Sequence, residues 1–289
     1  MKLIISFLFA ISFSWGIGLK GLIIPPNAHV LSTAGTGIAG GISPSLNPAL
    51  NISKHSYIQF SLNHWLGDIK GSHTVYHWGG AIPQTISIQS WNAKDLELRD
   101  DTPNDTPLGT FGIYYVAAAY SISHHLNTPY RFGIRIQTNY THLFTESMSG
   151  ITLDAGALFP LGSFMTAGVV VRNLGYEYTN NLRAELPVEI GLGTKLKLPF
   201  NVSILTDAIY LKEKGIDFRM GVRTHFKWLN MHAGTSETSG TSIHEKRTAK
   251  ALGFSFNYHQ WLISYGIYYH ENSILGPTLP QFLDVRRYL

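Results

Sequence analysis

The stretch LSTAGTGIAGGISPSLNPAL, residues 31–50, does not match any ordinary element of secondary structure. It lies within residues 21–53, a region without a single Asp, Glu, Lys or Arg. Glycines at positions 35, 37, 40 and 41 and prolines at 44 and 48 exclude a long helix. A segment with so little charge is too apolar for a solvated loop, yet its backbone groups need hydrogen-bond partners. We therefore expect the rest of the chain to form a container around it.

The composition favours a membrane barrel over a soluble enzyme. Charged residues make up only 14% of the chain, whereas about 25% is usual in soluble domains. The chain also has 15 Tyr, 15 Phe and 6 Trp, whose rings are favoured where a protein meets lipid headgroups. It has no Cys, which excludes disulfides and cysteine nucleophiles. The net charge of +4 is scattered without a basic run, so we expect no nucleic-acid partner.

The first residues are typical of a secretory signal peptide. Lys2 precedes an uncharged run over residues 3–13, and Ser14-Trp15-Gly16 offers a cleavage site after Gly16. The alternative, a membrane anchor reaching Leu19, is shorter than the roughly 20 apolar residues of a spanning helix. We expect three parts: a signal peptide (1–16), an N-terminal hatch or plug segment (17–55) and an outer-membrane β-barrel (56–289). The expected location is the bacterial outer membrane.

Beyond residue 53, apolar and polar residues alternate with the period of a β-strand. Between residues 130 and 143, one face carries Phe132, Ile134, Ile136 and Tyr140, and the other carries arginines and polar residues. The same alternation recurs over residues 188–197 and 217–228. Several runs are much longer than the usual 5–6 residues of soluble strands and reach the roughly 9–11 residues of a tilted membrane strand. The predicted fold is all-β, an antiparallel transmembrane barrel of about 14 strands whose lumen the N-terminal segment plugs.

Strand-like runs can be assigned along the whole barrel region. They cover residues 56–66, 70–78, 84–91, 111–122, 130–144, 150–158, 163–173, 188–198, 201–211, 217–226, 229–237, 248–258, 261–270 and 280–289. Connections after even-numbered strands are mostly short, and those after odd-numbered strands are mostly longer and polar. Outer-membrane barrels place short turns in the periplasm and longer loops outside. The longest irregular segment, residues 91–107, carries five acidic residues and is predicted to be a partner-contacting loop.

A series of motifs resembles the PorV/PorQ family of outer-membrane proteins, within the wider FadL-like group of 14-stranded barrels. The matching motifs are Ala34-Gly35-Thr36-Gly37-Ile38-Ala39, Asn47-Pro48-Ala49, residues 150–156, residues 171–175, Glu185-Leu186-Pro187 and residues 275–278. The resemblance implies a hatch that includes Gly35, Gly37, Gly40, Asn47 and Pro48.

The resemblance also implies two possible functions, and neither is enzymatic. PorV-like members serve type IX secretion, so secretion components and cargo proteins would be partners. FadL-like members pass long-chain fatty acids or other hydrophobic molecules, so the partner would be a hydrophobic small molecule. The secretion accessory is the leading hypothesis and the hydrophobic channel is the alternative. In both, outer-membrane lipid surrounds the barrel.

Motifs for cofactors and catalysis lack the context they need. Residues 35–40, GTGIAG, match the dinucleotide fingerprint in letters only, because no strand precedes them and prolines interrupt any following helix. The 13 histidines show no metal-ligand spacing such as HExxH, and no GxSxG nucleophile motif occurs. We therefore expect no cofactor, no metal and no catalytic residue.

Charged side chains on the inner faces of the strands are the candidate lumen residues. They are Arg131, Arg135, Asp154, Glu189, Lys195, Arg219 and Arg223. One interpretation is that they solvate the wall and pair with each other or with carbonyls of the hatch. The other is that some of them bind the headgroup of an anionic ligand.

Overall fold

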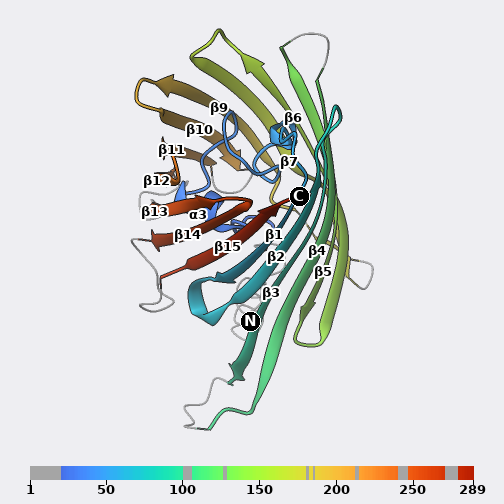
Figure 1. Ribbon diagram of the computed structural model, residues 1–289. Coiled ribbons are helices and arrows are strands. Elements are labelled where there is room, and N and C mark those ends of the chain that lie inside the picture. The colour runs from blue at the N-terminus through green and yellow to red at the C-terminus, as the bar shows by residue number, and fades with distance from the viewer. Residues whose placement is uncertain are drawn as a thin grey trace.

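The computed structural model describes residues 21–99, 106–125, 129–179, 182–184, 186–211, 215–239, 247–270 and 279–289. The predicted signal peptide and the motif at 275–278 lie outside these residues. The described chain forms one antiparallel sheet of 15 strands, of which β8 pairs only with β7. The other fourteen close into a barrel, because β1 pairs with β15 and β6 pairs with β7 (Figure 1). The predicted fold class is confirmed.

Each predicted strand has an observed counterpart. The strands are β1 (Tyr57–His64), β2 (Lys70–Trp78), β3 (Gln84–Leu98), β4 (Gly109–His125), β5 (Arg131–Leu143), β6 (Glu146–Pro160), β7 (Met165–Thr179), β8 (Leu182–Ala184), β9 (Glu189–Leu198), β10 (Val202–Leu211), β11 (Gly215–Phe226), β12 (Leu229–Ser239), β13 (Arg247–Tyr258), β14 (Trp261–His270) and β15 (Gln281–Tyr288).

The prediction of an irregular loop over residues 91–107 is wrong for residues 91–98. β3 continues to Leu98, and residues 100–105 lie outside the described part of the chain. The β3–β4 register shifts between Ala93 and Leu96, and Asp95 has a φ of 56°. Such a bulge moves the alternating pattern by one residue, which hides the strand from a search for period two.

The outer face of the barrel is apolar, as the alternation predicted. On β5, Phe132, Ile134, Ile136 and Tyr140 are 43%, 50%, 47% and 45% exposed, although each is large and hydrophobic. Soluble proteins rarely expose continuous apolar surfaces of this kind, whereas a barrel in lipid requires one. Within the described residues, no helix has both the length and the apolar character to cross a membrane.

Residues 21–53, called the inner segment from here on, run through the interior of the barrel (Figure 1). They contain two short helices, α3 (Ala28–Ser32) and η1 (Pro48–Leu50); a third, η2 (Leu66–Asp68), lies between β1 and β2. The side chain of Asn27 accepts a hydrogen bond from Val30 N at 3.0 Å and so caps α3. Nearly all residues from 24 to 51 are buried. The inner segment therefore has its own packed contacts with the wall.

Glycines on the inner faces of the wall strands let the inner segment approach closely. They form four cross-strand pairs: Gly133 with Gly156, Gly168 with Gly193, Gly221 with Gly234, and Gly253 with Gly266. A Cβ atom at Gly234 would lie 2.3 Å from the carbonyl carbon of Thr33, and one at Gly133 would lie 2.2 Å from that of Pro48. Backbone atoms cannot rotate away as a side chain can, so Gly133 and Gly234 exclude any side chain while the inner segment is in place.

Candidate binding site inside the barrel

A cavity of about 60 Å³ lies between the inner segment and the wall. Its inner-segment side is mostly apolar and includes Leu22, Ile23, Ile24, Val30 and Leu46. Its wall side is polar and includes Gln89, Tyr115, Arg135, Gln137, Asp154, Arg172, Asn173, Glu189 and Arg219. One water needs about 10–15 Å³ on this scale. The cavity therefore holds only a few waters, and a larger guest requires the inner segment to move.

A second cavity, of about 20 Å³, lies on the other side of the loop at residues 42–45. It is lined by Tyr57 at the start of β1 and by residues of β2 to β5, so it lies nearer the end of the barrel at which β1 begins. Ser45 and Arg135 line both cavities. The two cavities are therefore separated by this loop and by one arginine.

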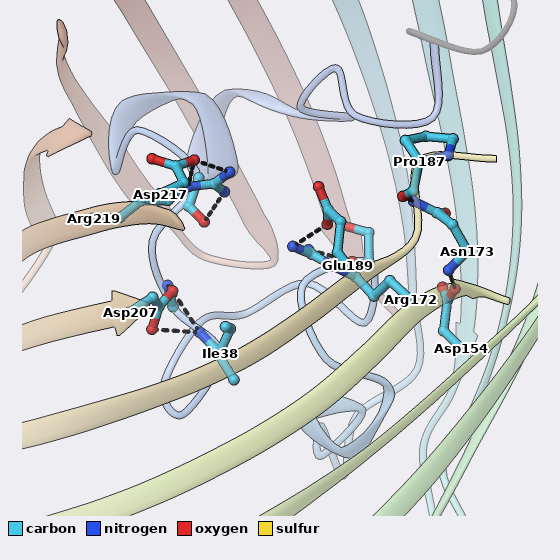
Figure 2. A network of polar contacts seen from close by, with 12 residues as sticks. Ile38, Asp154, Arg172, Asn173, Pro187, Glu189, Asp207, Asp217 and Arg219 are labelled. Atoms are coloured by element: carbon cyan, nitrogen blue, oxygen red, sulfur yellow. Dashed lines mark hydrogen bonds and ion pairs between the residues drawn. The ribbon is translucent and has the colours of Figure 1, made fainter. Parts of the chain in front are cut away.

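Two ion pairs across neighbouring strands form much of the polar wall. Arg135 on β5 lies directly opposite Asp154 on β6, and their Nη1 and Oδ2 atoms are 2.9 Å apart. Arg172 on β7 lies opposite Glu189 on β9, with 2.5 Å between Nη2 and Oε2 (Figure 2). All four side chains are largely buried, with 12% exposure or less. Because each positive charge is matched, neither arginine is a free site for an anionic ligand.

A third pair lies on a single strand. On β11, Arg219 binds Asp217 through Nε and Nη2 at 2.8 and 2.6 Å. Its Nη1 donates to the carbonyl of Gly35 on the inner segment at 3.1 Å. Arg219 therefore joins the wall to the inner segment as well as neutralising a carboxylate.

A β-bulge aims Asp154 at the backbone of the neighbouring strand. The β6–β7 register shifts between Leu153 and Ala155, and Asn173 opposite the shift has a φ of 61°. The amide N–H of Asn173 donates to Asp154 Oδ1 at 2.7 Å, and its side chain donates to the carbonyl of Pro187 at 3.0 Å (Figure 2). Asn tolerates this left-handed conformation better than most residues. The bulge thus places one carboxylate between an arginine and a backbone amide.

Two aspartates of the wall hold backbone amides of the inner segment. Asp207 on β10 accepts from Gly37 N at 2.6 Å and from Ile38 N at 3.1 Å (Figure 2). Asp284 on β15 accepts from Ala28 N, in the first turn of α3, at 3.0 Å. A carboxylate at that position satisfies a free helical N–H and interacts favourably with the helix dipole.

Arg223 on β11 also binds the inner segment, in this case as a hydrogen-bond donor. Its Nη2 donates to the carbonyl of Gly40, and its Nη1 lies 3.1 Å from His29 Nε2. An arginine has no acceptor, so His29 accepts this hydrogen bond and is neutral. Burial, followed by the nearby His232, Arg223 and Arg286, lowers the pKa of His29 well below its ordinary value.

Asn47 connects the inner segment to itself and to two wall strands. Its amide nitrogen lies within hydrogen-bond distance of the carbonyls of Ile38 (3.0 Å), Ala157 (3.3 Å) and Val169 (3.2 Å), and its oxygen accepts from Ala49 N at 3.0 Å. The residue is 0% exposed. Gly156 leaves the space for it, because a Cβ there would lie 2.0 Å from Asn47 Oδ1.

We expect Asn47→Ala to lower the free energy of unfolding by about 1–3 kcal/mol, since buried backbone groups lose their partner. Asn47→Asp is expected to cost more, because a carboxylate cannot donate to the surrounding carbonyls. Urea unfolding of the protein in lipid vesicles, followed by tryptophan fluorescence, measures both. Asn92→Ala, on β3, is the matched control. Equal stability of the Asn47 variants and this control contradicts the expectation.

The structure places all seven candidate lumen residues on inner faces of strands. Arg135, Asp154, Glu189 and Arg219 line the first cavity. Lys195 and Arg223 lie against the inner segment near Gly40, and Arg131 is half-buried at the first residue of β5. Of the hatch residues, Gly35 and Gly40 offer carbonyls to arginines, Gly37 donates to Asp207, and Pro48 begins η1.

Four wall residues of the site were not among the candidates: Arg172, Asp207, Asp217 and Asp284. Asp217 is two residues from Arg219 on β11, and Arg172 is two residues from Val170 on β7, so each pair lies on the same, inward face of its strand. The alternation of the sequence could therefore have identified both residues. Asp207 is harder to find, because its inward neighbours Ile209 and Leu211 are apolar and pack with Ile38. Both faces of β10 then appear hydrophobic, and the alternation does not distinguish inside from outside.

Comparisons with known proteins identify the fold. No family model matches the chain, and no curated protein matches it. Among solved structures, it is similar to the CymD monoaromatic hydrocarbon channel, with a TM-score of 0.71, 10% identity, and coverage of 92% of this chain and 98% of that one. It is also similar to the P. putida toluene transporter TodX, with a TM-score of 0.69, 9% identity, and coverage of 91% of this chain and 98% of that one. A Pseudomonas aeruginosa FadL homologue gives a TM-score of 0.63 at 10% identity, with coverage of 91% of this chain and 98% of that one. At this identity the likeness shows the fold alone, a closed antiparallel β-barrel.

Proposed function

We propose that this protein is an outer-membrane channel for hydrophobic compounds in which the inner segment acts as the plug. The observation that carries the proposal is the first cavity, where apolar residues of the inner segment, Leu22 to Ile24 with Val30 and Leu46, face a neutralised polar wall. An apolar solute gains by leaving water for the apolar side chains on the inner-segment side of this cavity, while the wall side stays polar. The similar structures, which include a monoaromatic hydrocarbon channel and two toluene transporters, support this choice of solute class.

The proposed route runs past the loop at residues 42–45. A solute that enters the first cavity meets Ser45 and Arg135, which also line the second cavity. Arg172 Nη1 donates to the carbonyl of Ser45 at 3.3 Å. Because Ser45 and Arg135 line both cavities, the proposed passage begins with a shift of this loop away from Arg135 and Arg172.

Uptake by whole cells tests the function. A Gram-negative host without its own hydrocarbon channels is given this chain or an empty vector, and the entry of labelled toluene, a labelled long-chain fatty acid and a labelled hydrophilic sugar is followed. We expect faster entry of at least one hydrophobic compound and unchanged entry of the sugar. Equal entry of every compound with and without the chain contradicts the proposal.

A pair of variants connects transport to the cavity. Leu22→Gln adds a polar group to the apolar side of the first cavity and is expected to slow hydrophobic uptake several-fold, since burying an amide without a partner is unfavourable. Ile52→Gln makes a comparable change on the same segment at a residue that is 46% exposed and lines neither cavity. If both variants slow hydrophobic uptake equally, the effect comes from impaired folding or membrane insertion and not from the cavity.

A role as an accessory protein of type IX secretion remains a prediction that rests on the sequence motifs. Its test is whether translocon or attachment components co-purify with the protein. Export that continues unchanged after deletion of the gene contradicts it.

A further inference from the structure

The end of the barrel that carries the short turns has an unusual distribution of charge. This end, called the short-turn rim, consists of residues 52–56, 77–84, 121–125, 129–131, 158–166, 195–203, 223–231, 255–262 and 285–289, which meet at one end because the strands are antiparallel. None of these stretches contains an Asp or Glu. Their exposed basic side chains include Lys54, Lys197, Lys227 and Arg287. Among the side chains of these stretches, the Asp and Glu charges are therefore missing and the Lys and Arg charges remain.

The opposite end of the barrel carries charges of both signs. Acidic residues there include Asp68 after β1, Asp95 and Glu97 on β3 and Glu146 at the start of β6, and they lie beside basic residues such as Lys70, Lys94 and Arg99. The remaining acidic residues, such as Asp154, Asp207 and Asp284, lie on inner faces of strands and are buried. The asymmetry is therefore a property of the two ends and does not arise from the lumen.

Large apolar side chains extend from the same short turns. Phe200 is 88% exposed, Tyr258 70%, Phe164 60% and Trp228 58%. Phe200 also has a φ of 60°, a left-handed conformation that favours glycine or asparagine over phenylalanine. A bulky aromatic side chain that is exposed and strained at a turn does not stabilise the barrel itself. We therefore expect it to contact a surface outside the barrel.

Basic and aromatic groups are interleaved around the rim. Lys227 is next to Trp228 in the β11–β12 turn, and Lys197 is three residues from Phe200 in the β9–β10 hairpin. The guanidinium of Arg287 lies 5.6 Å from the ring centre of Trp261. Aromatic rings favour the headgroup region of a bilayer, and Lys and Arg near it attract anionic lipids.

We propose that the short-turn rim binds the headgroups of anionic glycerophospholipids in the leaflet that it faces. The groups lie at the ends of membrane-spanning strands, so they meet the headgroup layer without any rearrangement. They also come from four turns between β6 and β14 and from residues at β15 and before β1, a wider spread than the contiguous patch that a protein partner would favour. The proposal does not depend on what the channel transports.

The test uses the full chain in vesicles of equal parts phosphatidylcholine and phosphatidylglycerol, from which the protein is extracted with its closely bound lipid. We expect the retained lipid to be enriched at least about two-fold in phosphatidylglycerol, and the enrichment to fall as salt is raised from 0.05 to about 0.5 M. Lys197→Gln with Lys227→Gln is expected to abolish most of the enrichment. Both lysines are exposed, so the barrel should still fold, which heat-modified mobility on a gel verifies.

Lys70→Gln with Lys94→Gln is the matched control, because it removes two exposed lysines from the opposite end. It is expected to leave the enrichment unchanged. The proposal is overturned if the wild type shows no preference for phosphatidylglycerol, if both double variants lose the enrichment equally, or if the rim captures an acidic protein without any lipid preference.

Discussion

Gly234→Val is expected to make the barrel leak. The Cβ of a valine at this position would lie 2.3 Å from the carbonyl carbon and 2.4 Å from the oxygen of Thr33, both backbone atoms of the inner segment. Overpacking of this kind costs about 1–3 kcal/mol. If that cost favours displacement of the inner segment, the displaced fraction rises by about 5- to 150-fold. Conductance of single proteins in a planar bilayer measures the change directly.

Gly109→Val is the control, since a Cβ at Gly109 meets nothing within 4 Å. Gly168→Ala adds a smaller overlap on another strand, 2.8 Å from the carbonyl oxygen of Ile38, and should leak to a smaller extent. If Gly234→Val and Gly168→Ala both fold and conduct no more than Gly109→Val, the inner segment does not close the lumen. That result would contradict the proposal that the inner segment acts as a plug, but it would not decide which solute the barrel carries.

The second large effect is expected at the ion pair of Arg172 and Glu189. Arg172→Met leaves Glu189 buried without its partner, and breaking a buried pair costs about 3–5 kcal/mol. Arg172→Met together with Glu189→Met is expected to recover most of this loss, because replacing both charges by apolar side chains is often close to neutral. The measurement is again urea unfolding in vesicles.

An exposed pair supplies the comparison. Arg99 and Glu97 lie 2.7 Å apart with side-chain exposures of 48% and 52%, and a pair of this kind contributes about 0–1 kcal/mol. Arg99→Met is therefore expected to change stability little. If Arg172→Met costs no more than Arg99→Met, water in the cavity screens the inner pair, and the wall is more hydrated than its burial indicates.

The outer face was predictable because its signal is local. Lipid contact requires an apolar residue at every second position, whatever the neighbouring strand is, so residues 130–143 alone reveal it. The bulge at Asp95 is where this reasoning failed, since one extra residue reverses the parity of everything after it. The length of β3 consequently became visible only through its pairing with β4.

The inner face was only partly predictable. Arg135 and Asp154 could be recognised as inward residues, but their pairing depends on the register between β5 and β6. Asp207 gave no signal, because the inner segment turns the neighbouring inward positions of β10 into apolar contacts. The wall glycines likewise have meaning only once the backbone that each one meets is known.

By itself, then, the sequence determined a barrel of about 14 strands with an apolar exterior, together with an uncharged N-terminal stretch unsuited to water, because composition and period two are properties of short segments. Only the tertiary structure decided how that stretch is held. Its backbone amides meet carboxylates as distant in sequence as Asp284 from Ala28, 256 residues apart. No local pattern encodes such a contact, since it exists only after the sheet has closed and placed β15 beside β1.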